Sequence, residues 1–294
     1  MLKTNEENLV SIAAQAKVIS GSGGGPSMSV DGEPFWLPGT GGITYNVKVG
    51  DRAFGWEADH VEPGVSAVAD EEKKTARANS GLNFLACSGN TARLVSGDAK
   101  GKTGTVIGHH GGAEHVIMDF EDEALEAMTL DDTILVRTLG QGLKLLDYPE
   151  TKCFNLDPSL LHKMGIEENG DGTITVPVTT VVPAELMGSG LGSINVARGD
   201  YDIMAHDTEY AKELGVDKIR FGDLVAIKDH DNTHGRAFRR EAMTIGVVIH
   251  SNCLLAGHGP GVTTLITSAK PLIKPTVDGG ANIAKILGIG RYRA

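Results

Sequence analysis

Short apolar runs separated by glycine- and aspartate-rich breaks dominate the hydrophobic pattern of this 294-residue chain. Such runs predict strands, because a strand needs only about four to eight residues while an amphipathic helix repeats over ten or more. The predicted strands lie at residues 43–49, 90–95, 103–107, 115–120, 133–139, 173–182, 223–227, 243–250 and 263–268. We therefore predict a mainly β fold with a few short helices, barrel-like or sandwich-like, rather than a doubly wound sheet.

A few segments carry helical signals. Asp157 and Pro158 stand where an N-cap and a first helical residue would stand. Residues 208–214 predict a short helix that ends at Gly215. Residues 70–79 open with acidic residues, which suits a helix N-terminus. Further helical segments are predicted at 120–128, at 282–287 and, if it is not a strand, at 9–19.

Composition and charge suggest two subdomains. Hydrophobic residues make up 40% of the chain, enough for a buried core. The net charge of −11 is uneven, because residues 1–150 contain 12 basic and 22 acidic residues whereas residues 151–294 contain 15 and 16. We predict a boundary near residue 150, where a strand pattern also ends. The acidic first half repels phosphate backbones, which argues against nucleic acid as the main partner.

The pattern favours a soluble, cytoplasmic protein. No apolar run approaches the ~20 residues that span a bilayer, and the N-terminal residues lack the basic start and apolar stretch of a signal peptide. Cys87, Cys153 and Cys253 lie far apart without a CxxC pair, as in a reducing compartment. Many short strands and few aromatic residues suggest a homo-oligomer.

Residues 93–107 predict a β-hairpin with a tight glycine turn. This segment resembles the KOW motif of ribosomal and transcription-elongation proteins, in which a glycine–lysine turn closes a small SH3-like barrel and often contacts RNA. The matching positions are Gly97, Lys100, Gly101, Gly104 and Val106. Lys100 and Lys102 are the basic residues of this turn, and the half around them is acidic, so a barrel turn without nucleic acid is the alternative.

Imidazoles and carboxylates stand on either side of this hairpin. His60 and Glu62 are two positions apart, so in an extended segment they would point to one side and could share a divalent ion. His109 and His110 follow the second strand, with His115 close behind, and the glycines around them leave room for a ligand. Mixed imidazole and carboxylate sets suit Zn, Mn, Fe or Ni. The alternative is a set of solvated loop residues.

A second candidate cluster follows the predicted strand at 223–227. Asp229, Asp231 and His234 gather at its end, where catalytic groups commonly lie, and one carboxylate could act as a general base. The alternative is an ordinary hairpin turn, since aspartate and asparagine are standard turn residues.

The loop near residue 258 adds a further histidine. His258 stands in a Gly-His-Gly-Pro-Gly turn that packing alone explains poorly, so we predict that it binds a metal or lines a site. Cys253 is a weaker candidate for a nucleophile, because buried thiols are common and inert.

Taken together, several segments resemble an uncharacterised protein family found in anaerobic and thermophilic bacteria and archaea. The segments are residues 59–64, 96–112, 220–227 and 257–261. The alternation of short strands with Gly/Asp/His loops also resembles the acetamidase/formamidase group of metal-associated amide hydrolases. That likeness implies a β-rich amidase, but it assigns no catalytic residue to this chain.

The leading hypothesis is an enzyme that uses a divalent metal (Zn, Mn, Fe or Ni) to hydrolyse an amide-like bond of a small molecule. The predicted metal ligands are His60, Glu62, His109, His110 and His258, and the predicted catalytic residues are Asp229, Asp231 and His234. One alternative is a non-enzymatic KOW-like barrel that binds a protein or RNA. Another is a structural metal at an oligomer interface.

Overall fold

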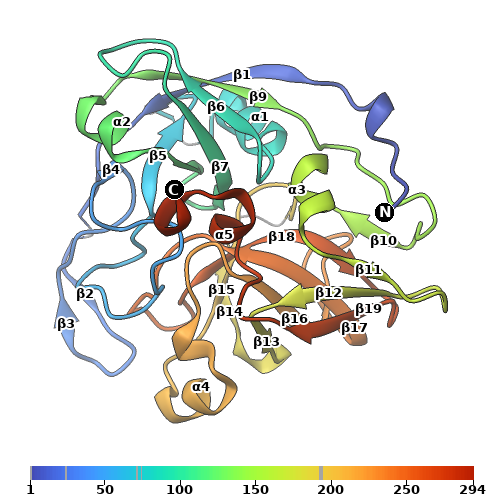
Figure 1. Cartoon of the computed structure of the whole chain (residues 1–294). Helices are drawn as coiled ribbons and strands as arrows, with labels where there is room; N and C mark the ends of the chain where they lie inside the picture. The colour runs from blue at the N-terminus through green and yellow to red at the C-terminus, as the bar shows by residue number, and fades with distance from the viewer. Residues whose placement is uncertain (1, 24, 71, 74, 192–194) are drawn as a thin grey trace.

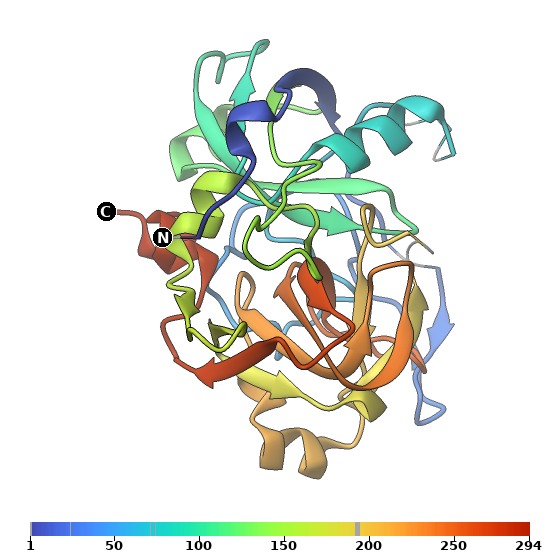
Figure 2. The same cartoon turned by 90° about the vertical axis from the view of Figure 1, so that its right-hand side faces the viewer.

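Two curved sheets of different build form the two subdomains of this mainly β protein. The computed structural model describes residues 2–23, 25–70, 72–73, 75–191 and 195–294. The sheet of the first subdomain lies in the upper half of Figure 1 and that of the second in the lower half, and the view turned by 90° in Figure 2 keeps this division. The boundary predicted near residue 150 falls in the connection that leads from the first sheet to the second.

The first sheet closes into a six-stranded barrel. Its strands are hydrogen-bonded in the order β1, β9, β6, β7, β8, β5, and β5 pairs again with β1, which closes the ring. The bounds are β1 Ile12–Val18, β9 Thr133–Thr138, β6 Thr91–Leu94, β7 Thr103–His110, β8 His115–Asp119 and β5 Gly64–Val68, with β4 Ile43–Thr44 added beside β5. Closure pairs the strand edges that an open sheet would expose.

The second sheet is open. Its strands run β13 Thr180–Val182, β16 Leu224–Asp231, β17 Ala237–Val248, β18 Gly261–Ser268, β15 Tyr201–Ile203 and β14 Met187–Leu191, and β10 Thr151–Cys153 pairs with β18. A smaller sheet holds β11 Glu167–Glu168, β12 Ile174–Val178 and β19 Ile273–Val277, and β2 Ser27–Met28 pairs with β3 Pro34–Phe35. The long antiparallel strands β16, β17 and β18 are visible at the bottom of Figure 1.

The helices within the described residues are short. They are α1 Arg77–Leu85, α2 Asp122–Ala127, α3 Pro158–Lys163, α4 Thr208–Leu214 and α5 Ile283–Leu287, with 3₁₀ turns η1 Glu6–Asn8, η2 Ala184–Leu186, η3 Val216–Lys218 and η4 Gly290–Tyr292. None of them is both long and apolar enough to cross a membrane.

Local chemistry explains which of these elements the sequence predicts. Asp157 caps α3 by accepting a hydrogen bond from the Ser159 backbone N–H at 2.7 Å, as predicted. Gly215 ends α4 with a φ of 72°, in the left-handed region. The helix predicted at 70–79 is wrong, since α1 begins only at Arg77. The reason is that the Asn79 side chain accepts hydrogen bonds from two earlier backbone N–H groups at 2.9 Å, which holds a loop there.

The subdomains meet where β7 crosses the second sheet. Gly108 lies so close to Ile249 and Thr263 that a Cβ atom there would overlap both side chains. One residue later, the His109 backbone N–H donates to Thr263 Oγ1 at 3.0 Å, and that hydroxyl donates to the His109 carbonyl at 3.1 Å. The larger hydrophobic core accordingly takes residues from both halves of the chain, Ile107 and Ile249 among them.

Candidate metal centre

The loop before β5 delivers two site residues to this junction. Its ends are tied to the second subdomain, because the Val61 backbone N–H donates to Ser251 Oγ at 2.9 Å and the Ser251 N–H donates to the Val61 carbonyl at 2.9 Å. His60 has a φ of 57°, a left-handed conformation that non-glycine residues rarely adopt. Because the segment is bent rather than extended, His60 and Glu62 reach different histidines.

Glu62 lies between the two histidines of the β7–β8 hairpin. His110 and His115 are paired directly across that hairpin. Glu62 is 1% exposed, forms a very short contact with His110 Nδ1, and lies 2.9 Å from His115 Nδ1. It also accepts hydrogen bonds from the Gly41 backbone N–H at 2.8 Å and from the Ser66 hydroxyl. Burial alone would raise the pKa of Glu62, but His115 and His110 hold it well below its usual range.

The second subdomain contributes two aspartates and a histidine. Asp200 and Asp202 flank Tyr201 at the start of β15, so they share one face of the strand. His250 follows β17, and its Nδ1–H donates to the Ser251 carbonyl at 2.9 Å, so Nε2 is the ring nitrogen that faces the aspartates. That Nε2 lies 2.9 Å from Asp200 Oδ2 and 3.4 Å from Asp202 Oδ1, within ion-pair distance of both. Apart from this contact, neither His250 Nε2 nor Asp200 Oδ2 makes a hydrogen bond within the described part of the chain.

Two further imidazoles complete the cluster. His60 Nε2 lies 3.2 Å from His258 Nδ1 and 3.7 Å from Asp202 Oδ2, and His258 Nδ1 lies 3.0 Å from the same carboxylate oxygen. Burial lowers the pKa of His60, but hydrogen bonds to Asp202 and Asp59 outweigh it and raise this pKa to about 11. The His258 side chain is 35% exposed, whereas that of His60 is 12% exposed, so His258 faces the solvent side of the cluster.

The donor geometry fits a divalent cation. Among the described residues, four sets of donors have atoms within 4.8 Å of one another: His60, Asp202 and His250; His110, Asp200 and His250; Glu62, His110 and His115; and His60, Cys253 and His258. Tetrahedral ligands with bonds of 2.0–2.1 Å are about 3.3 Å apart, and the separations around Asp202 and His250 run from 2.9 to 3.7 Å. Imidazole with carboxylate is a donor set for Zn, Mn, Fe or Ni.

A glycine keeps the space beside these donors open. Gly261 is the first residue of β18 and pairs with Asp202 across the ladder. A Cβ atom at this position would overlap both Asp200 Oδ2 and His250 Nε2. Both atoms therefore point into a space that a larger residue would fill.

The structure brings together four of the five predicted metal ligands, namely His60, Glu62, His110 and His258, and places the fifth elsewhere. His109 is fully buried on the opposite face of β7, where its Nε2–H donates to the Ala86 carbonyl at 2.6 Å. Burial lowers the pKa of His109 to about 4. His109 belongs to none of the donor sets found among the described residues.

The predicted catalytic residues lie at the end of the β16–β17 hairpin, outside these donor sets. Asp231 Oδ1 accepts from the Thr233 backbone N–H at 3.0 Å and from its hydroxyl at 2.7 Å, which closes a turn. Asp229 Oδ1 accepts from the Glu241 N–H at 2.6 Å. His234 lines a separate pocket of about 480 Å³. The three side chains are thus occupied by local contacts or face another cavity.

Sequence reasoning missed the two aspartates and did not select His115 and His250 as ligands. The alternation of Asp200 and Asp202 around one strand residue was a usable signal, since such residues share a face. His250 ends a predicted strand in the same loop as His258, so the second half offered a signal as well. Cys253, considered as a nucleophile, lies beside His60 and His258, and burial raises the pKa of its thiol.

Comparison with known proteins gives a family and one solved relative. The model of the N-terminal domain of a family described as a domain of unknown function (DUF4438) matches residues 26–162, and that of its C-terminal domain matches residues 163–287. A solved structure, "Crystal structure of TM1086", is similar to this chain with 45% sequence identity and a TM-score of 0.90, over 96% of this chain and 98% of that one.

No curated protein matches the chain. The two family models together span most of the sequence and follow the same order as the two subdomains. The chain therefore belongs to the DUF4438 family.

Proposed function

We propose that this protein is a divalent-metal-dependent hydrolase that acts on an amide-like bond of a small molecule. The observation that carries the proposal is the convergence of buried donors from both subdomains on His250, whose Nε2 lies 2.9 Å from Asp200 Oδ2 and 3.4 Å from Asp202 Oδ1. His110 and His60 complete two donor sets around it. A cation bound between these atoms would neutralise the two buried carboxylates.

The residues of this cluster divide into ligands and positioning groups. His250 offers Nε2, because its Nδ1–H is held by the Ser251 carbonyl. His110 offers Nε2 in the same way, because the ionised Glu62 accepts the hydrogen bond from its Nδ1–H. A carboxylate behind a ligating histidine fixes its tautomer and raises its basicity. Asp200 and Asp202 supply the negative charge that a divalent ion requires.

Hydrolysis also needs a group that moves protons, and His258 is the candidate. A divalent cation supplies the polarisation of a carbonyl and an activated water near neutral pH. His258 is the most exposed imidazole of the cluster, and Asp202 holds its Nδ1 at 3.0 Å. Its Nε2 is thereby available to take a proton from water and pass it to a leaving amine.

The alternatives have weaker support. A KOW-like surface needs free cations in the hairpin turn, but Lys102 forms ion pairs with Glu121 and Glu123. A metal at an oligomer interface needs histidines from two copies, but a single chain already brings His60, His110, His250 and His258 together. The convergence of these four histidines favours a site complete within one chain.

Elemental analysis by mass spectrometry tests the proposal on untagged protein purified without chelator. We expect near-stoichiometric Zn, Mn, Fe or Ni in the wild type and in His234→Ala, and strong loss in His250→Ala and Asp200→Asn. Ammonia release from a panel of small amides then tests the reaction, with His258→Gln as the variant that should lose turnover but keep metal. Equal metal content in all variants, or no metal in any, would overturn the metal centre.

A further inference from the structure

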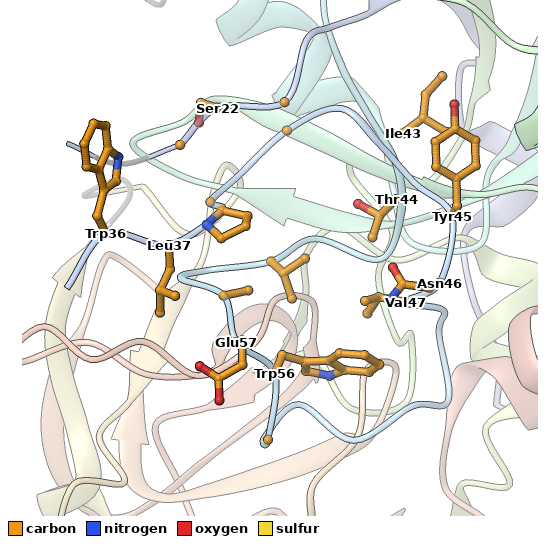
Figure 3. Close-up of a pocket in the computed structure, with 18 residues that line it drawn as sticks. Ser22, Trp36, Leu37, Ile43, Thr44, Tyr45, Asn46, Val47, Trp56 and Glu57 are labelled. Carbon is orange, nitrogen blue, oxygen red and sulfur yellow. The ribbon is translucent and has the colours of Figure 1, made fainter. Parts of the chain in front are cut away.

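Both tryptophans of the chain line one pocket. The pocket has a volume of about 970 Å³, and Trp36 and Trp56 are the only tryptophans in the sequence. Figure 3 shows Trp36 and Tyr45 at opposite sides of it, with Trp56 and Glu57 along a third side. Trp36 is 71% exposed and Tyr45 is 51% exposed, although aromatic residues make up only 5% of the chain. Such a concentration of accessible rings is a binding feature rather than a packing one.

The charge of the pocket selects the kind of ligand. Glu57 is the one charged side chain among the described residues that line it. The pocket also lies in residues 1–150, whose net charge is −10. Aromatic ring faces attract cations and are indifferent or unfavourable to anions, and a carboxylate adds to this preference. The lining therefore suits a positively charged group attached to an apolar body.

The loops that line the pocket also carry residues of the candidate metal centre. Ala58 and Val61 line the pocket, while His60 between them joins the histidine cluster. Pro38, also in the lining, accepts a hydrogen bond from the Asp59 backbone N–H at 2.8 Å. On the neighbouring loop, Gly41 lines the pocket and its N–H donates to Glu62 Oε2 at 2.8 Å. A molecule in the pocket thus contacts the segments that hold His60 and Glu62 in place.

We propose that this pocket binds a small organic cation, a substituted ammonium with an aromatic or branched apolar body. Trp36, Tyr45 and Trp56 offer ring surfaces to the apolar part, and Glu57 offers its carboxylate to the charge. The further assignment of this cation as part of the substrate rests on the proposed hydrolase function, whereas binding of the cation does not.

Tryptophan fluorescence provides a direct test, because both emitters are in the pocket. The protein as purified is titrated with benzyltrimethylammonium, benzyl alcohol or phenylacetate, which share a benzyl group and differ in charge. We expect a saturable change with the cation at about fivefold lower concentration than with the alcohol, and no saturation with the anion. Equal responses to all three, or no saturation with the cation, would overturn the proposal.

Matched variants locate the charge preference. Glu57→Gln should weaken cation binding about two- to fivefold and leave alcohol binding unchanged. Glu7→Gln, an exposed glutamate in η1 of the same acidic half, removes the same charge and should change neither. Equal weakening by both variants would reduce the effect to net charge and contradict a role for Glu57. Cation binding that persists in His250→Ala separates this proposal from the hydrolase function, since that variant tests only the metal centre.

Discussion

Two regions of this protein look alike in sequence and differ in structure. The end of the β16–β17 hairpin and the subdomain junction both combine aspartates with histidines. At the hairpin end, Asp229 and Asp231 accept hydrogen bonds from backbone N–H groups of their own hairpin. At the junction, His250 Nε2 and Asp200 Oδ2 contact each other at 2.9 Å and make no other hydrogen bond in the described residues. The two regions differ in whether the polar side-chain atoms are bound by their own hairpin or by side chains from distant segments.

The comparison shows why local density of polar residues is a poor guide to a site. An aspartate that lies a few residues from a free backbone N–H accepts a hydrogen bond from it and closes a turn, so its carboxylate oxygen already has a partner. Donor atoms at the junction come from four separate segments, and the contacts of their carboxylates run between segments, as from the Gly111 backbone N–H to Asp200 Oδ1 at 2.8 Å. Chemistry is therefore expected where polar atoms converge over long sequence distances.

The largest expected effect separates the two regions by metal-dependent stability. At a metal concentration about 1,000 times the dissociation constant, binding stabilises the native state by about 4.1 kcal/mol. We expect Asp200→Asn to lose this stabilisation and Asp231→Asn to keep it. Thermal unfolding with and without the metal measures both. Retention of the full shift in Asp200→Asn would break the comparison.

His109 is buried next to the junction but belongs to none of the donor sets, so we expect it to affect the pH dependence of stability and not metal binding. Burial lowers its pKa to about 4, below the value of about 6.5 in the unfolded chain. Between these two pH values the unfolded chain binds a proton that the native state does not, so the free energy of unfolding falls as the pH falls, by about 3 kcal/mol in all. This contribution to the free energy of unfolding is fully present above the pKa of the unfolded chain and is lost below the native-state pKa.

The measurement is urea unfolding of wild type and His109→Gln at a series of pH values. The variant should show an acid-induced loss smaller by about 3 kcal/mol, and it should keep its metal. His234→Gln, on the exposed hairpin end, serves as the control and should keep the wild-type slope. An unchanged slope in His109→Gln would contradict the assignment of this pH dependence to His109.

A smaller effect is expected from the positioning carboxylate. Glu62→Gln keeps the shape of the side chain but removes the charge that holds the Nδ1–H of His110 and faces His115. Loss of such a partner typically weakens metal affinity by about 10- to 100-fold. Chelator competition measures the affinity, and Glu57→Gln provides a control in the neighbouring pocket. Unchanged affinity would exclude Glu62 from the metal centre.

The smallest effect is expected at the hairpin end. Asp231→Ala removes the two hydrogen bonds to Thr233 and should destabilise the protein by about 1 kcal/mol. Metal content should stay unchanged. Loss of metal in this variant would mean that the two regions are coupled, and the comparison would need revision.

Most of the fold could be predicted from the sequence, because strand signals are local. The strands β6, β7, β8, β9, β16, β17 and β18 lie where apolar runs predicted them, and Asp157 and Gly215 mark helix ends as their chemistry requires. Closure of the barrel by β1 and β5 was not predictable in detail, since residues 9–19 fit a helix or a strand. Only pairing with strands far along the chain decides that they form β1.

The site was partly predictable for the same reason. His60, Glu62, His110 and His258, predicted as ligands from residue type and from the glycines around them, lie at the junction, and their binding of a metal stays a prediction. Asp200 and Asp202 were not predicted, because no local pattern shows that β15 pairs with β18 and thereby reaches the barrel. His109 was misplaced among the candidates, since one residue along a strand reverses the side of the sheet.

The origin of the donors at the junction has a consequence for how the two subdomains come together. The donors come from both subdomains, Glu62 and His110 from one and Asp200 and His250 from the other. Each of the two sets that contain His250 combines both halves, so under the proposed function folding of the separate halves is not sufficient to retain an ion between them. On that proposal a bound metal would report correct docking: a chain whose barrel and open sheet each fold, but fail to meet, would be recognised by its missing ion.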